Sequence, residues 1–136
     1  MKTKTFLFVT IISLLIGCEE SVENSFKGVA PAGLVHWNVL SVEGPTIVEV
    51  NKAITFNVSC PATSGCDYVS TFVSDDSNGN TILIKAYGNT TKNRMCTQAA
   101  VPIVVKYEFT PHAKGQYVLK FINKDESIIK RSFTAN

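Results

Sequence analysis

Apolar and polar residues alternate along much of the chain after Leu34. The alternation is clearest in segments 53–60, 103–109 and 116–122, where every second residue is hydrophobic. A period of two is typical of a β-strand with one face in a core and the other in water. Turn residues such as Asn78-Gly79 separate the alternating segments. The pattern predicts strands at 35–42, 46–50, 53–60, 67–74, 81–87, 103–109, 116–122 and 128–133.

These segments predict an all-β domain. No long stretch keeps the spacing of an amphipathic helix, so we expect helices to be absent or limited to a single turn. About seven or eight strands with one wet face each suit a two-sheet antiparallel sandwich, which buries one face of each sheet. A small closed β-barrel is the alternative architecture.

The N-terminus has the features of an export signal. Lys2 and Lys4 precede an apolar run at 6–16, which is too short to span a membrane. The run ends in Leu15-Ile16-Gly17-Cys18, which resembles the lipobox of bacterial lipoproteins. The resemblance implies that residues 1–17 are a cleaved signal peptide and that Cys18 carries the lipid. Several acyl chains would hold the protein on the membrane permanently.

The segment that follows Cys18 predicts a linker. Residues 18–33 are polar and aperiodic and reach Pro31 and Gly33, so we expect a flexible tether before a single domain at 34–136. Glu19, Glu20 and Glu23 resemble the acidic residues after the lipidated Cys of surface-exported lipoproteins, although ordinary linker charges would look the same. The expected location is therefore the cell envelope, as an outer-membrane lipoprotein facing either the periplasm or the surface.

Composition limits the classes of partner. Hydrophobic residues make up 45% and charged residues 18% of the chain, which indicates a folded protein. The net charge of +2 comes from Lys2 and Lys4, and the remaining basic and acidic residues are equal in number. This balance gives no support for nucleic-acid binding.

One local motif is similar to immunoglobulin-like sandwiches. Tyr117 follows Gly115 and precedes the core position Leu119 by two residues, as in the tyrosine corner of that fold. Leu119 stands where antibody domains have a Cys, and Trp37 lies too early for their core Trp, so the antibody disulfide is excluded. An ordinary core Tyr in another sandwich is the alternative interpretation.

Three cysteines remain besides Cys18, so at most one internal disulfide forms. The stretch 88–101 has no strand periodicity, and a loop of this length in a compact domain is usually functional, disordered or tied down. A disulfide from Cys96 to Cys66 would tie it down. Pairings of Cys60 with Cys66 or Cys96 remain open on these grounds. Cys60 can also lie in the core as a small apolar residue.

The region from about Cys66 to Ile122 resembles a group of small exported bacterial β-sandwich proteins. The resemblance rests on Ser64-Gly65-Cys66, Asn80 to Ile84, Cys96-Thr97-Gln98, Tyr107 to Pro111 and Gly115 to Phe121. The two recurring cysteines of that group match Cys66 and Cys96, which implies a bridge between them. The group has no established activity, so the resemblance implies no catalytic residue.

The sequence contains no pattern that indicates catalysis, a metal or a cofactor. His36 and His112 lack partners at metal-ligand spacing, and we expect both at the surface. The segment 75–80 fails as a calcium loop, because the required Gly and Glu are missing. Nucleophile and phosphate-loop motifs are also missing. We therefore expect a non-enzyme, with a hydrolase or a metal-binding protein as remote alternatives.

The sequence favours a binding or interaction module. The candidate binding loops contain Asp75, Asp76, Asn78, Asn80, Lys92 and Arg94. The expected partner is the membrane, through the lipid, together with an envelope or extracellular protein or glycan. A structural or assembly lipoprotein that joins its partner through a sheet edge or through Cys60 is the alternative. Exposed Trp37 or Tyr87 would favour binding, and an unprotected edge strand would favour assembly.

Overall fold

The computed structural model describes residues 26–92, 94–98 and 100–136. The predicted signal peptide at 1–17, Cys18 and the first part of the tether lie outside this range. The described residues form these strands: β1 (Val35–Trp37), β2 (Ser41–Glu43), β3 (Ile47–Val48), β4 (Ile54–Cys60), β5 (Asp67–Asn78), β6 (Thr81–Thr90), β7 (Ile103–Phe109), β8 (Gly115–Ile122) and β9 (Ile128–Ala135). The described part of the chain contains no helix with the length and hydropathy needed to cross a membrane.

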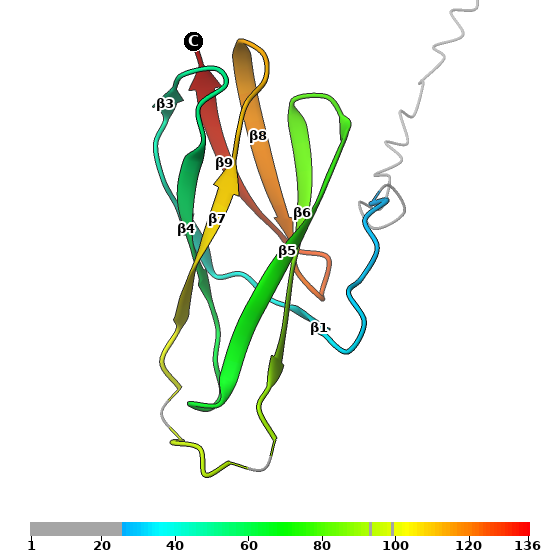
Figure 1. Cartoon of the computed structure of the whole chain (residues 1–136), viewed down its shortest axis with the longest axis vertical. Helices are drawn as coiled ribbons and strands as arrows, with labels where there is room; N and C mark the ends of the chain where they lie inside the picture. Colours follow the sequence, from blue (N-terminus) through cyan, green and yellow to red (C-terminus); the bar gives the residue numbers. More distant parts are fainter. Residues whose placement is uncertain (1–25, 93, 99) are drawn as a thin grey trace, which may run out of the picture.

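The strands form two sheets that pack face to face (Figure 1). The larger sheet has the order β1-β6-β8-β9-β3, with β5 on the other edge of β6, and the smaller has the order β2-β4-β7. This confirms the sandwich and excludes the closed barrel. The larger sheet is mixed, because β6 pairs with β8 and β3 pairs with β9 in parallel.

Several strand boundaries differ from those that the pattern predicts. The predicted strand 35–42 is divided, because the chain leaves the large sheet after β1 and enters the small sheet at β2. Asn123 holds this crossing: its Oδ1 accepts the Val39 N–H at 2.8 Å, and its Nδ2 donates to the Val39 carbonyl at 3.2 Å. The β5–β6 hairpin extends beyond its predicted ends, and Gly79 turns it with a φ of 67°.

The core lies between the sheets and follows the predicted alternation. It is built from Val39, Val42, Val48, Phe56, Val58, Cys60, Ile82, Ile84, Ala86, Tyr107, Tyr117, Leu119, Phe121, Phe133 and Ala135. Phe72, Tyr107 and Phe121 make edge-on ring contacts within it. Such rings bury large apolar areas and dominate the energetics of a small core.

Strand β6 is buried on both faces. Leu83, Lys85 and Tyr87 point away from the inter-sheet core and are still less than a tenth exposed. The described end of the predicted tether contributes contacts here, because the Lys27 N–H donates to Asp75 at 2.7 Å and the Phe26 ring lies 4.9 Å from the Lys85 ammonium. Residues 26–33 therefore contain no strand but lie against the large sheet.

Candidate functional site

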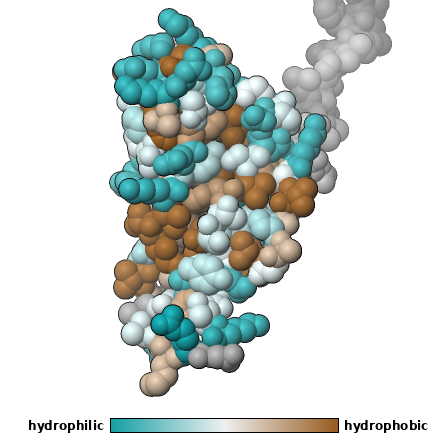
Figure 2. All heavy atoms as spheres, in the orientation of Figure 1, coloured by the Kyte–Doolittle hydropathy of each residue, from teal (hydrophilic) through white to brown (hydrophobic). Residues whose placement is uncertain are grey.

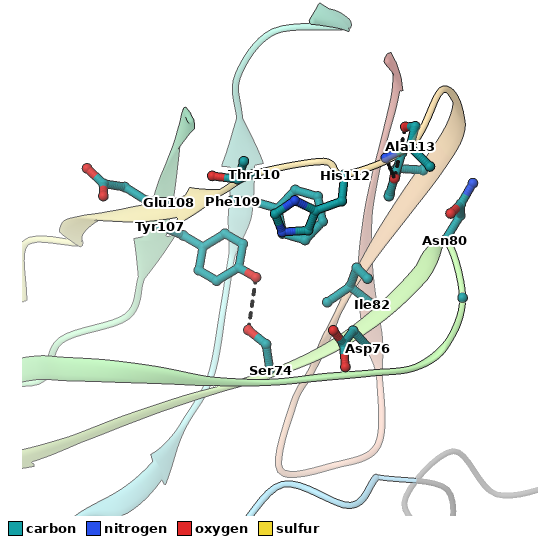
Figure 3. A pocket seen from close by; sticks show the side chains of 12 residues that line it. Ser74, Asp76, Asn80, Ile82, Tyr107, Glu108, Phe109, Thr110, His112 and Ala113 are labelled. Atoms are coloured by element: carbon teal, nitrogen blue, oxygen red, sulfur yellow. Dashed lines mark hydrogen bonds between the residues drawn. The ribbon is translucent and has the colours of Figure 1, made fainter. Parts of the chain in front are cut away.

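A cleft of about 550 Å³ opens between the two sheets at the end that carries the β5–β6 hairpin. Four parts of the chain line it: the hairpin, the end of β7, the loop from β7 to β8, and the start of β8 (Figure 3). Its lining consists of Ser74, Asp76, Gly79, Asn80, Ile82, Tyr107, Glu108, Phe109, Thr110, His112, Ala113 and Tyr117. We call this feature the hairpin cleft.

The inner part of the hairpin cleft is aromatic and fixed by hydrogen bonds. The Tyr107 hydroxyl lies 2.9 Å from the Ser74 hydroxyl, which joins the edge strands of the two sheets (Figure 3). Burial raises the pKa of Tyr107, and the nearby Asp76 charge acts in the same direction. Tyr107 therefore stays neutral at physiological pH.

The loop that forms one wall is held by a tyrosine corner. The Tyr117 hydroxyl donates to the Ala113 carbonyl at 3.0 Å and accepts from the Ala113 N–H at 3.2 Å. The Phe109 ring packs edge-on against Tyr117 at 5.7 Å. The motif expected from the spacing of Gly115 and Tyr117 is therefore present, and it gives the loop that carries His112 a defined conformation.

The rim of the hairpin cleft is polar and carries negative charge. Asp76 and Asn80 lie on the hairpin, while Glu108 lies at the opposite end of the cleft from Asn80 (Figure 3). His112 is exposed, as expected, and lies in the loop from β7 to β8. The lining contains no Lys or Arg. An aromatic interior with a few polar groups at the edge is typical of a ligand site.

The structure separates the predicted binding residues. Asp76 and Asn80 line the hairpin cleft, whereas Asn78 is exposed at the end of β5 and is not part of the lining. Asp75 is buried, and its carboxylate accepts the Lys27 and Ser77 N–H groups. These hydrogen bonds lower the pKa of Asp75, and through them its carboxylate holds the N-terminal segment in place.

Lys92 and Arg94 belong to the segment between β6 and β7, which lies at the other end of the sandwich (Figure 1). A smaller cleft of about 290 Å³ forms there, and Arg94 lines it, whereas Lys92 is exposed outside its lining. The two groups of predicted residues therefore do not form one site.

The expected disulfide closes this second end. Cys66 and Cys96 are bonded, with Cα atoms 5.4 Å apart. The Gly65 N–H donates to the Thr97 carbonyl at 2.8 Å, and the Thr91 N–H donates to the Cys66 carbonyl at 2.9 Å. The pairing implied by the resemblance is confirmed, and it anchors the long loop as predicted.

Asp67 organises the turn beside the disulfide. Its carboxylate accepts hydrogen bonds from the Thr90 hydroxyl at 2.7 Å, the Thr63 N–H at 2.6 Å and the Ser64 N–H at 3.1 Å. These bonds favour the charged form and hold the pKa of Asp67 well below its usual range. No sequence signal singled out Asp67, because its partners come from two separate segments.

The structure corrects two expectations: that Tyr87 could be an exposed aromatic contact, and that His36 lies at the surface. Tyr87 is only 6% exposed and packs beside His36, so it offers no contact surface. His36 is half-buried rather than at the surface, with its Nε2 2.8 Å from the Ile122 carbonyl. The Trp37 indole donates to the Pro61 carbonyl at 2.8 Å, with the Lys124 ammonium over its ring.

The remaining thiol does not support nucleophilic chemistry. Cys60 is free and fully buried in β4, as predicted for an apolar role, and burial raises its pKa to about 11. A buried thiol with a raised pKa is inert, and it cannot reach a partner protein. No group of three or more potential metal ligands gathers in the described part of the chain.

Comparison with protein families identifies the domain. The model of the ORF11 beta-sandwich domain matches residues 56–135. The chain belongs to this family. The match includes most of β4 and the strands β5–β9, and therefore the whole lining of the hairpin cleft and the disulfide. No curated protein and no solved structure matched the chain.

Proposed function

We propose that this protein is an exported, lipid-anchored binding module of the cell envelope. Its ligand enters the hairpin cleft and is held there without chemical conversion. The observation that carries this proposal is the aromatic interior and acidic rim of the cleft on a rigid two-sheet scaffold. The Tyr117 and Tyr107 hydrogen bonds fix the cleft walls, which lowers the ordering cost of binding.

The charges at the rim favour a particular ligand chemistry. Asp76 and Glu108 attract a cationic group, and the ring faces of the interior suit an apolar stem or a sugar face. A basic side chain of an envelope protein and an amino sugar share this chemistry. No cofactor and no nucleic acid enter the proposal.

Export and anchoring are supported by two features of the chain. The sequence Leu15-Ile16-Gly17-Cys18 ends an apolar run, and the Cys66–Cys96 disulfide suits an oxidising compartment such as the bacterial periplasm. We expect Cys18→Ser to abolish incorporation of labelled fatty acid and to release the protein from the outer-membrane fraction. Retention of the variant in membranes, with no label in the wild type, would contradict the anchor.

Binding is tested by charge reversal at the cleft. The full chain with Asp76→Lys is compared with the wild type for capture of components from envelope extracts, identified by mass spectrometry and sugar analysis. Lys92→Glu at the opposite end is the matched control, since it also reverses one exposed charge. We expect Asp76→Lys alone to lose the captured component while thermal stability is unchanged. Equal capture by both variants would refute the hairpin cleft as the site, and turnover of a captured component would refute the non-enzymatic role.

Assembly through a sheet edge is a second candidate function. It is favoured by the length and exposure of strand β7, which lies at one edge of the small sheet.

A further inference from the structure

The edges of the two sheets differ in how well they are protected. The edge strands β1, β2 and β3 have only two or three residues each. Strand β5 is long, but its register with β6 shifts at Val69/Thr71 and at Asp75/Asn78, and the N-terminal segment lies against it. Short strands, bulges and covering segments are common protections against pairing with another chain.

Strand β7 has none of these protections. All seven of its residues pair with β4 in unbroken register, and Pro102 and Pro111 lie outside the strand. Within the described part of the chain, no backbone hydrogen bond is formed at its other edge. Figure 1 shows β7 at the front of the molecule, and in Figure 2 apolar side chains gather on this face below the hydrophilic upper end.

The side chains that β7 exposes carry both signs of charge. Val104 is 64% exposed, and the exposed Lys106 and Glu108 follow on the same face of the strand. Lys106 disfavours pairing of β7 with an apolar strand of another chain, because its ammonium group would lose water beside an uncharged side chain. A partner strand with a carboxylate opposite Lys106 removes that cost.

A second copy of β7 supplies this carboxylate. When two β7 strands pair antiparallel about a two-fold axis at Tyr107, Lys106 of each copy lies opposite Glu108 of the other. A two-fold axis at Lys106 gives a longer overlap but places two ammonium groups opposite each other, which is destabilising. We propose that two copies of this chain associate through the free edges of β7, in the register centred on Tyr107, to form one continuous sheet.

This interface is isologous, so each copy uses the same patch and the assembly closes at two chains. The proposal does not rest on a ligand in the hairpin cleft. Glu108 lines that cleft and Lys106 does not, so K106E is the reversal that leaves the cleft lining unchanged. The dimer is measured as a mass, whereas the cleft is measured by ligand capture, so the two proposals can fail separately.

The test uses charge reversal with rescue. The full chain, purified in a non-ionic detergent, is analysed by sedimentation velocity and light scattering from about 1 µM to about 1 mM, a range that covers weak association. The wild type is expected to dimerise as concentration rises. K106E and E108K, each alone, are expected to weaken self-association by about tenfold or more, since like charges then face each other twice.

Two rescues identify the register. The double variant K106E/E108K restores opposite charges and is expected to dimerise like the wild type. An equimolar mixture of K106E and E108K is expected to form a heterodimer, because one chain then presents two carboxylates and the other two ammonium groups. Circular dichroism checks that every variant is folded.

Three results would overturn the proposal. A wild type that is monomeric over the whole range refutes it. A dimer that survives both single reversals, or one that neither the double variant nor the mixture restores, shows that the β7 edges are not paired in this register.

Discussion

The disulfide at the lower end of the sandwich allows a quantitative prediction. Replacing Cys66 and Cys96 together by Ser removes a cross-link between residues 30 positions apart. In the chain-entropy model, opening a loop of this length lowers the free energy of unfolding by about 3.7 kcal/mol. This is a large part of the ~5–15 kcal/mol that stabilises a typical domain.

Some native contacts beside the disulfide remain in the Ser double variant, so we expect its fold to be retained. The hydrogen bonds from Gly65 to Thr97 and from Thr91 to Cys66 can still form without the covalent bond. They preserve the native fold but do not restrict the unfolded chain, which is where the model places the stabilisation. We therefore expect a loss of about 2–4 kcal/mol with the fold retained.

Urea titration followed by circular dichroism and by the fluorescence of Trp37 measures this change. Reduced wild type serves as the internal comparison, because it lacks the same bond and keeps the native side chains. The reduced wild type and the double variant should unfold at the same urea concentration. A loss below about 1 kcal/mol, or a clear difference between the two, would show that the cross-link does not act through the unfolded state.

Three further predictions follow from other buried or hydrogen-bonded groups. Asn123→Ala leaves both polar groups of the Val39 backbone without their partner in a site only 9% exposed, and should lower the free energy of unfolding by about 2–4 kcal/mol in urea titrations. Asp67 has a lowered pKa in the folded state, so its contribution is full above its unfolded pKa of about 4 and is lost as the pH falls through the folded value. The stability of Asp67→Asn measured against pH should therefore fall less in acid than that of the wild type, and parallel curves would contradict this role. Iodoacetamide should label Cys60 only after unfolding, as followed by mass spectrometry, because the thiol is buried and its pKa is raised to about 11; rapid labelling of the native protein would contradict its burial.

Local pattern was sufficient to predict most of the strands. The apolar residues of β4, β7 and β8 face the core as their alternation indicated, since a period of two has only one way to bury a hydrophobic face. The turn at Asn78-Gly79 and the corner at Tyr117 were also predictable, because each depends on a few neighbouring residues. Burial of Cys60 followed from its place in the same alternation.

Other features depended on which segments meet across the sheets. The break between β1 and β2 occurs where the chain changes sheets, and Asn123, far away in sequence, holds it. The sequence made Tyr87 a candidate aromatic contact at the surface, yet β6 is covered on both faces and Tyr87 is buried. Alternation specifies one buried face, and it does not indicate whether another segment covers the second face.

The sequence by itself determined the fold class, the strands that contain most of the core residues and the elements that carry the candidate binding residues. Only the tertiary structure decided which of those residues act together. Asp76 and Asn80 join Glu108 and His112 in the hairpin cleft, while Lys92 and Arg94 lie at the far end and Asp75 is buried. The physical reason is that periodicity and turn chemistry act over a few residues, whereas a cleft forms where strands distant in sequence end side by side.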